Sequence, residues 1–369
     1  MRIGINALYL IPGGVGGTEI YLRSLLAAMI SVAPEHDYLV FTNRETADAP
    51  LPGLAMPQMV RAVNRPARII WEQIALPVAS IRHKVDVMLN PGFTAPVLSA
   101  CAQVTVFHDL QHKRHPRHFR WFDLPVWRAM LFASACVSDR LIAVSEATKA
   151  DLLRYYPVRE DAITVIGHGV DERFFHLPRN PEPMLLCVST LHPHKNLERL
   201  LRVFHRFHGR HPDYRLTLAG MKGFHAGPIE RLVRELGLQE AVHITGWIER
   251  ERLYELYSKA AGFVYPSTFE GFGMPVLEAL AAGLPVACSG FEPLRSVAGD
   301  AARLFDPTDE AAMLAALEQL IADAGSGGPA RAREFSWEAS ARATLEVLAS
   351  LVSDLQKWPG NSQGGEELP

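Results

Sequence analysis

Short apolar runs rich in Val, Ile and Leu alternate with helical patterns along almost the whole chain. Such alternation is typical of βαβ units, in which helices connect parallel strands. With 369 residues, the chain is longer than a typical single domain and has the length of two. The sequence therefore predicts an α/β fold with two doubly wound domains that face a central cleft.

The expected strands form two sets, separated by a proline-containing segment. We expect strands at residues 2–8, 38–42, 85–89, 104–108, 140–144 and 162–166, and again at 184–188, 215–219, 242–245, 262–265 and 285–287. Between the sets, residues 171–183 contain three prolines and little periodicity, which indicates a linker. We predict an N-terminal domain over 1–170 and a C-terminal domain over 171–356, whose final helix could pack back on the N-terminal domain. Residues 357–369 are Gly-rich and polar, which is typical of a disordered tail.

Composition and charge exclude several classes of protein. Close to half of the residues (48%) are apolar, but no run of them is long enough to span a bilayer. The first residues have a strand-like pattern and not that of a signal peptide, so we expect a cytoplasmic protein. The four cysteines have no paired spacing and are expected to be reduced core residues. Residues 1–170 carry 17 Lys and Arg against 14 Asp and Glu, an excess that could favour an anionic acceptor or membrane surface, or could be chance.

The most informative motif is the stretch 266–278, Pro-Ser-Thr-Phe-Glu-Gly-Phe-Gly-Met-Pro-Val-Leu-Glu. It follows an apolar strand and runs into a helix, with Pro275 in the first turn. Glycines in such a loop allow a ligand to approach the backbone, and free N–H groups at a helix start bind anions. Glu270 lies in the loop and Glu278 about two turns along the helix. An anionic ligand with hydroxyl groups at both ends, such as a nucleotide sugar, would match this pattern.

A second glycine-rich loop follows the first strand. Gly13-Gly14-Val15-Gly16-Gly17-Thr18 lies between a strand and a helix, where phosphate or sugar loops occur. It matches neither the dinucleotide fingerprint nor the Walker pattern, which needs a Lys after the last Gly. The alternative interpretation is a flexible surface turn.

Two further candidate residues follow predicted strands. Lys195 precedes a helix start and could neutralise a diphosphate, although most lysines are solvated surface residues. His108 ends a strand of the first half, where it would point into the cleft. The alternative for His108 is a structural hydrogen-bonding role.

The stretch 110–130 mixes histidines, cations and aromatic residues. His112, His115 and His118 have no Cys or carboxylate partners at metal-ligand spacing, so no metal is expected there. The cations and the aromatic residues Trp121, Phe122 and Trp127 could lie on a membrane interface or could form a solvated helix face. Hydrolase motifs of the Gly-x-Ser-x-Gly and His-Glu-x-x-His kinds are absent from the sequence.

Taken together, these motifs resemble those of the family-four retaining glycosyltransferases, which have the GT-B fold of two Rossmann-like domains. The resemblance covers nearly the whole chain and is densest in the second half. Besides 266–286, it rests on Thr245-Gly246-Trp247, Phe335-Ser336-Trp337-Glu338, Trp71-Glu72-Gln73, Val144-Ser145-Glu146 and His168-Gly169-Val170-Asp171. The Asp-x-Asp motif of metal-dependent sugar transferases is absent, so neither a metal nor another cofactor is expected.

The resemblance implies a role for each candidate residue. Glu278 would bind the ribose of the nucleotide, Glu270 the donor sugar, and Lys195 the diphosphate. The N–H groups of the Gly271-Phe272-Gly273 turn would meet phosphate and sugar. His108 would lie beside the sugar, and Gly16 and Gly17 would approach the diphosphate or acceptor from the other domain. By this resemblance, His108, Glu270 and Lys195 are the expected catalytic residues.

One position departs from the family pattern. Many members have an Arg five positions before the phosphate-binding Lys, where this chain has Thr190. The form with Thr resembles bacterial mannosyl- and rhamnosyltransferases of surface polysaccharides. Either Lys195 binds the phosphate alone or another Arg replaces the missing one.

The sequence therefore predicts a metal-independent retaining hexosyltransferase. By subgroup resemblance, its donor would be GDP-mannose, and its acceptor a glycan or lipid-linked glycan in lipopolysaccharide or related polysaccharide synthesis. A peripheral contact with an anionic membrane is an additional expectation, and nucleic acid is not an expected partner. The alternatives are a nucleotide-sugar epimerase of the same fold and a catalytically silent glycan-binding subunit.

Overall fold

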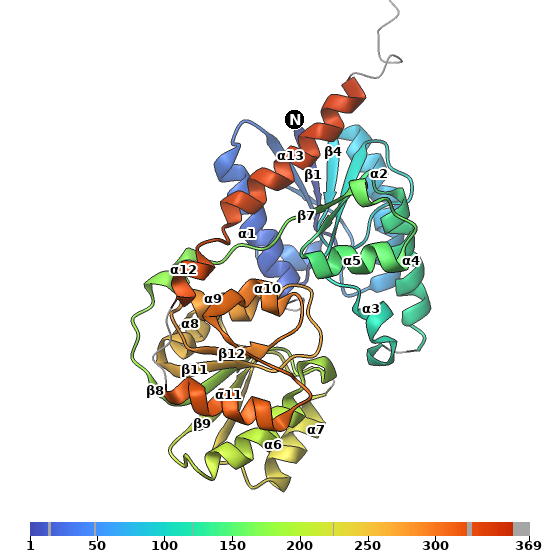
Figure 1. The fold of residues 1–369 in the computed structure, drawn as a ribbon. Coiled ribbons are helices and arrows are strands. Elements are labelled where there is room, and N and C mark those ends of the chain that lie inside the picture. Colours follow the sequence, from blue (N-terminus) through green and yellow to red (C-terminus); the bar gives the residue numbers. More distant parts are fainter. Residues whose placement is uncertain (14–15, 48, 120, 224, 323–326, 357–369) are drawn as a thin grey trace, which may run out of the picture. The chain divides into compact units, whose positions relative to one another are not determined.

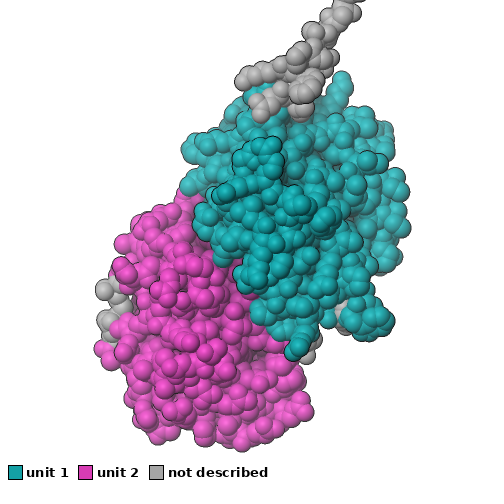
Figure 2. Space-filling model, turned by 45° about the vertical axis from the view of Figure 1, so that its right-hand side comes forward, with its two compact units in different colours: residues 1–167, 337–369 teal, residues 168–336 magenta. Residues whose placement is uncertain are grey.

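The computed structural model describes residues 1–13, 16–47, 49–119, 121–223, 225–322 and 327–356. They form two compact units (Figures 1 and 2): Met1–Gly167 together with the segment from Trp337 onward, and His168–Ser336. We call these unit 1 and unit 2. The predicted tail at 357–369 lies outside the described residues.

The described part of unit 1 contains a seven-stranded parallel sheet in the order β3-β2-β1-β4-β5-β6-β7. The chain starts in the middle of the sheet, adds strands to one side, and then crosses to the other side. Its strands are β1 (Arg2–Asn6), β2 (Asp37–Thr42), β3 (Leu54–Pro57), β4 (Val87–Asn90), β5 (Ala102–Phe107), β6 (Arg140–Ala143) and β7 (Ile163–Val165).

Helices lie between several of these parallel strands (Figure 1). They are α1 (Gly17–Val32), α2 (Arg65–Arg82), α3 (Gln111–Arg114), α4 (Leu124–Val137) and α5 (Glu146–Tyr155); a further helix of unit 1, α13 (Trp337–Gln356), comes from the end of the chain. Short 3-10 turns lie at Arg44–Thr46, Pro116–His118 and Glu160–Ala162. Ser145 caps α5, because its hydroxyl accepts a hydrogen bond from the N–H of Thr148.

The described part of unit 2 repeats this arrangement with a six-stranded parallel sheet in the order β10-β9-β8-β11-β12-β13. Its strands are β8 (Glu182–Val188), β9 (Arg215–Ala219), β10 (Val242–Gly246), β11 (Ala260–Tyr265), β12 (Val286–Ser289) and β13 (Arg303–Phe305). The helices are α6 (Leu197–His208), α7 (Ala226–Glu235), α8 (Arg250–Lys259), α9 (Met274–Ala281), α10 (Leu294–Ala298), α11 (Glu310–Ala322) and α12 (Gly328–Ala332). Turns of 3-10 helix lie at Glu172–His176, Pro193–Lys195 and Gly299–Ala301.

In both sheets the strand order reverses beside the first strand, as in doubly wound nucleotide-binding folds. The predicted α/β fold with two Rossmann-like domains is therefore confirmed. The edge strands β3 and β13 were not predicted. They are short and their apolar pattern is weak, so only their pairing with β2 and β12 identifies them as strands.

The division of the chain differs from the predicted domains in two details. It falls between Gly167 and His168, just before the predicted boundary at 170/171. Helix α13, which was assigned to the C-terminal domain but was expected to be able to pack back on the N-terminal domain, does so: it belongs to unit 1, where it packs against α1, β4 and β5. At its start, the Trp337 ring meets the Tyr21 ring at 5.9 Å. The buried residues Ala341, Leu345 and Leu348 show that its apolar stripe is used for packing within the molecule.

Candidate active site

The strand order of unit 2 places two loops beside each other at the carboxyl edge of its sheet. Strands β8 and β11 are neighbours, although β9 and β10 lie between them in the sequence. Residues 189–196 follow β8, and residues 266–273 follow β11. Ligands of doubly wound sheets bind at this point of reversal, outside the carboxyl ends of the strands.

Hydrogen bonds from both sides hold these two loops together. Asn196 adopts a left-handed conformation (φ 55°), and its side-chain amide donates to the carbonyl of Pro266 at 3.1 Å. The His194 carbonyl accepts from the Ser267 hydroxyl at 3.1 Å and from the Thr268 N–H at 2.7 Å. The loops therefore form a prearranged pair, which reduces the cost of ordering them around a ligand.

Lys195 and Glu270 meet across this pair of loops. The Lys195 Nζ lies 2.6 Å from Glu270 Oε1 and donates to the Tyr265 hydroxyl at 3.0 Å. Their side chains are only 13% and 11% exposed, so water screens the ion pair weakly. Burial raises the pKa of Tyr265 well above its usual value, and its hydroxyl stays protonated. The site thus presents one cation and one anion held at fixed positions.

The turn from Gly271 to Gly273 leads directly into α9. Gly273 has φ 114°, a conformation that side chains disfavour, and a Cβ there would lie 2.5 Å from the Leu294 Cδ2 atom. Both the backbone and the neighbouring side chain therefore require glycine. The preceding Phe272 is buried, with its ring 4.5 Å from that of His168. The first N–H groups of α9 follow this turn and can bind an anion.

Glu278 is held by two groups from α8. Its Oε1 lies 3.1 Å from Arg250 Nη1, and its Oε2 accepts a hydrogen bond from the Tyr257 hydroxyl at 3.0 Å. Burial raises the pKa of Glu278, while the positive charge of Arg250 opposes the shift. Asp171 binds the other side of the Arg250 guanidinium at 3.3 Å, and the phenyl ring of Phe174 lies 5.0 Å from it. The carboxylate is therefore oriented by buried contacts.

Sequence reasoning missed Arg250, Tyr257 and Tyr265 as members of the site. Arg250 is the first residue of α8, in a strongly polar helix where an arginine is unremarkable. Only its position opposite Glu278 distinguishes it, and no local pattern signals a pairing between residues 28 positions apart.

Thr190, at the position where family members often have an Arg, lies half-buried in the loop after β8. Its carbonyl accepts from the N–H of His192 at 2.8 Å. Arg199, on the following helix, donates to the carbonyl of Pro307 at 2.8 Å and to the side chain of Asn196 at 3.1 Å. Through these hydrogen bonds, Arg199 helps to fix the loop that follows β8.

His108 lies in unit 1, directly after β5. Its Nε2 is 2.8 Å from the carbonyl of Pro91, and the rings of Tyr21 and Phe93 lie edge-on at 4.7 and 5.1 Å. Burial lowers the pKa of His108 to about 4, so the ring is neutral at physiological pH. Because the carbonyl of Pro91 only accepts, the proton of the neutral ring is on Nε2.

The described part of the first glycine loop leads into α1. Gly16 caps this helix with φ 61°, and Gly17 is its first residue. Glu19, in the first turn, accepts from the N–H of Gly13 at 2.7 Å and pairs with Arg23 at 2.9 Å. Gly14 and Val15 lie outside the described residues. Of the predicted site residues, those of this loop and His108 belong to unit 1, and the others belong to unit 2.

The histidines of the stretch 110–130 have separate surroundings. His112 is buried, and its Nε2 lies 2.8 Å from the Tyr156 hydroxyl. The rings of His115 and His118 stack at 5.1 Å. Within the described ranges, no group of three or more His, Cys, Asp or Glu side chains is arranged to hold a metal ion.

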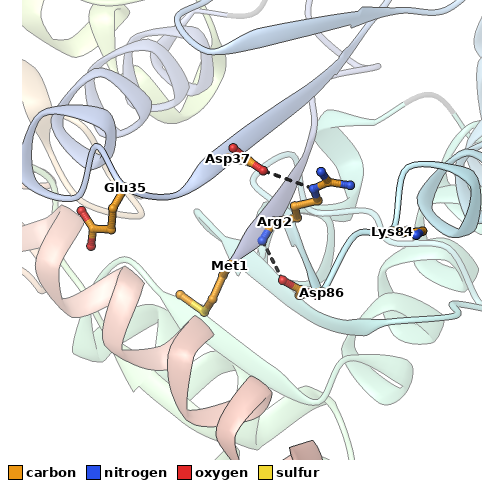
Figure 3. A pocket seen from close by; sticks show the side chains of 6 residues that line it. All are labelled: Met1, Arg2, Glu35, Asp37, Lys84 and Asp86. Carbon is orange, nitrogen blue, oxygen red and sulfur yellow. Dashed lines mark hydrogen bonds and ion pairs between the residues drawn. The ribbon is translucent and has the colours of Figure 1, made fainter.

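A charged pocket occurs at the opposite edge of the unit 1 sheet (Figure 3). It is lined by Met1, Arg2, Glu35, Asp37, Lys84 and Asp86. Arg2 pairs with Asp37 at 3.1 Å, and its N–H donates to Asp86 at 2.7 Å. Since these residues lie at the amino ends of β1, β2 and β4, the pocket is remote from the edge where doubly wound sheets bind ligands.

Comparison with known proteins defines the class to which this fold and site belong. Residues 15–174 match the model of glycosyltransferase family 4, and residues 170–338 match that of glycosyl transferases group 1. Among solved structures, sucrose-phosphate synthase from Thermosynechococcus elongatus superposes with a TM-score of 0.77 over 96% of this chain and 100% of that one, at 21% identity. Anabaena HepE in complex with UDP and glucose gives 0.73 over 95% and 100%, at 18% identity. These likenesses show the GT-B fold.

Curated relatives are more similar in sequence. The O-antigen chain mannosyltransferase B of Escherichia coli is 30% identical over 293 residues, which are 73% of this chain and 75% of that protein. An MMP α-(1→4)-mannosyltransferase of Mycolicibacterium hassiacum is 31% identical over 270 residues, 68% of this chain and 65% of that protein. The chain belongs to the family-four glycosyltransferases and is a glycosyltransferase with the GT-B fold.

Proposed function

We propose that this glycosyltransferase moves a hexose, with mannose as the first candidate, from a nucleoside diphosphate to a hydroxyl of a glycan or lipid-linked acceptor in surface polysaccharide synthesis. The observation that carries the proposal is the similarity to O-antigen chain mannosyltransferase B over about three quarters of both chains. The O-antigen chain mannosyltransferase RfbU of Salmonella typhimurium, 27% identical over 218 residues, supports the same substrate class. GDP-mannose is the favoured donor.

Each part of the unit 2 site would bind one part of this donor. Glu278, oriented by Arg250 and Tyr257, would accept hydrogen bonds from the ribose hydroxyls. The N–H groups of Phe272 and Gly273 and the start of α9 would bind the diphosphate. Glu270 would bind hydroxyls of the hexose, and Lys195 would bind the adjacent phosphate.

The reaction would proceed with retention at the anomeric carbon. The bond between this carbon and the phosphate oxygen breaks, and the bond to the acceptor oxygen forms on the same face of the sugar. The leaving diphosphate takes the acceptor's proton. Lys195 and the helix start would stabilise the negative charge that develops on the diphosphate, in place of a metal.

His108 would contribute as a neutral hydrogen-bonding group. With its pKa lowered to about 4 by burial, it carries no charge at neutral pH and is a poor general acid there. Its ring would orient a sugar hydroxyl. Gly16 and Gly17, at the start of α1, would allow the diphosphate or acceptor to approach the backbone.

A panel of nucleotide sugars, incubated with the purified chain and a lipid-linked glycan, tests this function. We expect extension of the glycan with a mannose donor, an unchanged anomeric configuration by NMR, and activity in the presence of EDTA. Transfer from another donor would show that the transferred sugar is not mannose, and a product with inverted anomeric configuration would disprove retention. Isomerisation of the donor without transfer, or binding without turnover, would contradict the proposal.

A further inference from the structure

Three consecutive residues of α2, Trp71-Glu72-Gln73, form a motif that lies outside the proposed donor site. Trp71 packs against the core of unit 1, and its Nε1 donates a hydrogen bond to Gln58 at 3.2 Å. Glu72 and Gln73 instead contact the loop at residues 91–97, which follows β4. We call this segment the β4 loop. The motif therefore joins α2 to a loop at the carboxyl edge of the unit 1 sheet.

Glu72 and Gln73 bind both the side chains and the backbone of the β4 loop. The Gln73 amide donates from Nε2 to the carbonyl of Ala95 at 3.1 Å, and its Oε1 accepts from the Val97 N–H at 2.8 Å. The Glu72 Oε2 accepts from the Thr94 hydroxyl at 3.0 Å. Because Glu72 is buried, water does not compete for this hydrogen bond. Two neighbouring side chains of α2 thus fix the second half of the loop.

The first half of the β4 loop is strained and contacts His108. Phe93 has φ 71°, a left-handed conformation that is unfavourable for a residue with a Cβ. Gly92 lies tightly against Tyr9, since a Cβ on it would lie 2.2 Å from the Tyr9 Cδ1 atom. The carbonyl of Pro91 lies 2.8 Å from His108 Nε2, and the Phe93 ring lies 5.1 Å from the imidazole. Such strain persists only where the surrounding structure imposes it.

The two halves of the β4 loop are linked through the strained residue. Phe93 directly precedes Thr94, which Glu72 holds, and follows the segment whose carbonyl faces His108. If the contacts of α2 were lost, Phe93 could relax to an ordinary conformation and displace the carbonyl of Pro91. The hydrogen bond made by one ring nitrogen of a histidine decides which tautomer is present. The orientation and the tautomer of His108 therefore depend on how the loop is held.

We propose, on the basis of the proposed function, that Glu72 and Gln73 are positioning residues for sugar transfer, which act through the β4 loop on His108. They hold the loop so that the carbonyl of Pro91 accepts the proton of His108 Nε2. In this tautomer Nδ1 is the hydrogen-bond acceptor of the ring. Trp71, by contrast, has a structural role in packing α2 on the sheet.

Other elements of unit 1 also hold the β4 loop. The Ala95 N–H donates to Ser134 Oγ of α4 at 2.9 Å, and Gln103 of β5 donates to the carbonyl of Pro96 at 3.0 Å. Because these hydrogen bonds do not involve the motif, variants of the motif should keep the loop near its place and the chain folded. What such variants lose is the accurate position of the Pro91 carbonyl. Thermal unfolding checks that they remain folded.

Nuclear magnetic resonance of the ring nitrogens, on the full chain with isotope-labelled histidines, tests the proposal without donor or acceptor. The spectra distinguish the two neutral tautomers, and His108→Asn identifies the signals of His108. We expect the Nε2–H tautomer in the unchanged chain and a mixture of tautomers in Gln73→Ala and Glu72→Ala. Gln58→Ala is the matched control: Gln58 is a half-buried glutamine that bonds the motif through Trp71, and its loss should leave these signals unchanged.

Steady-state kinetics with the donor identified by the panel tests the consequence for transfer. Gln73→Ala and Glu72→Ala should lower kcat about tenfold to a hundredfold, because a slightly misplaced group loses most of its effect in the transition state. The KM for the donor should change little, since the groups proposed to bind it belong to unit 2. In a His108→Asn background, Gln73→Ala should lower kcat no further, because the residue on which it acts is already absent.

Two further variants test the hydrogen bond between Glu72 and Thr94. Burial raises the pKa of Glu72, while the positive charge of Arg68 opposes the shift. A neutral amide therefore suits this position, and the side-chain oxygen of Glu72→Gln can still accept from the Thr94 hydroxyl. Glu72→Gln should recover most of the turnover that Glu72→Ala loses. Thr94→Val removes the same hydrogen bond from the side of the loop and should reproduce the loss, even if Glu72→Ala does not fold.

The outcomes separate this inference from the proposed function. The inference is wrong if Gln73→Ala and Thr94→Val leave either the signals of His108 or the turnover unchanged. A proton on Nδ1 in the unchanged chain, or additive losses from Gln73→Ala and His108→Asn, would also overturn it. If the unchanged chain transfers no sugar from any donor of the panel, that result counts against the proposed function alone, because the signals of His108 are measured without substrate.

Discussion

The carboxyl edges of the two sheets have the same strand order but different polar groups. In unit 2 the edge carries two ion pairs, Lys195 with Glu270 and Arg250 with Glu278. In unit 1 the strand ends carry the neutral side chains of Asn6, Asn90 and His108. Asn6 donates to Asn90 at 3.1 Å, and both are buried.

This difference indicates what each edge can bind. A fixed cation beside a helix start stabilises a diphosphate and the charge that grows on it during bond cleavage. Neutral amide and imidazole groups orient hydroxyls without attracting an anion. We infer that unit 2 has the groups for the donor and unit 1 those for uncharged sugar hydroxyls, and four measurements can break or sharpen this comparison.

The largest effect is expected at Lys195. In Lys195→Ala the leaving diphosphate loses its fixed cation, so we expect turnover to fall about a hundred- to a thousandfold. Steady-state kinetics with the donor identified by the panel measures this. Lys222→Ala is the matched control, because Lys222 forms an exposed ion pair with Glu230 at 2.7 Å and should change nothing. Equal activity in Lys195→Ala and the unchanged chain would remove Lys195 from the site.

The neutral edge of unit 1 predicts a specific pH dependence. His108 has an ordinary pKa of 6.5, which burial lowers to about 4 in the folded chain. Below about pH 6.5 the unfolded chain binds a proton that the folded chain does not. The free energy of unfolding therefore decreases as the pH is lowered. The loss due to His108 should reach about 2 kcal/mol by about pH 5.

Denaturant unfolding of the full chain at neutral pH and at about pH 5 measures this loss. His108→Asn should reduce the difference between the two pH values by the share of His108. The remainder should include His112, whose pKa burial also lowers to about 4. If His108→Asn leaves the difference in the free energy of unfolding between the two pH values unchanged, the histidine is already charged in the folded state at about pH 5. The description of the unit 1 edge as neutral would then be wrong.

Gly273 tests whether the charged edge depends on its backbone. Gly273→Ala places a Cβ against Leu294 in a left-handed conformation, and we expect a loss of about 2 kcal/mol in stability together with weaker donor binding. Gly237→Ala is the control for conformation alone, since Gly237 has φ 67° and open space around it. Adding Leu294→Ala should relieve the steric part of the loss. If Gly273→Ala lowers the free energy of unfolding no more than Gly237→Ala does, the close packing of Gly273 against Leu294 does not contribute to stability.

The sequence predicted the site unevenly for physical reasons. Glu270, Gly273 and Glu278 lie in one strand-turn-helix segment, so their spacing already describes their geometry. Arg250 and Tyr257 come from another helix, and only the folded chain brings them to Glu278. For helix α13 the sequence left two possibilities open, since an apolar stripe alone does not decide between the units, and the structure selects packing on unit 1.

Arg250 is expected to give the smallest effect, because it acts through Glu278. In Arg250→Met the Glu278 carboxylate loses a hydrogen bond at 3.1 Å and an opposing charge, and the pKa of Glu278 should rise. We expect donor affinity to fall about tenfold, the share of one charge-assisted hydrogen bond, with little change in the rate of the bound complex. Calorimetry with the nucleoside diphosphate measures this affinity.

A double-mutant cycle separates this positioning role from a direct contact between Arg250 and the donor. If Arg250 works by orienting Glu278, then Arg250→Met should cost nothing further in a Glu278→Gln background. The weaker affinity of Arg250→Met should also recover at higher pH, where Glu278 regains its charge. Additive losses in the cycle, or an affinity without pH dependence, would show that Arg250 binds the donor itself. The charged edge of unit 2 would then extend onto α8.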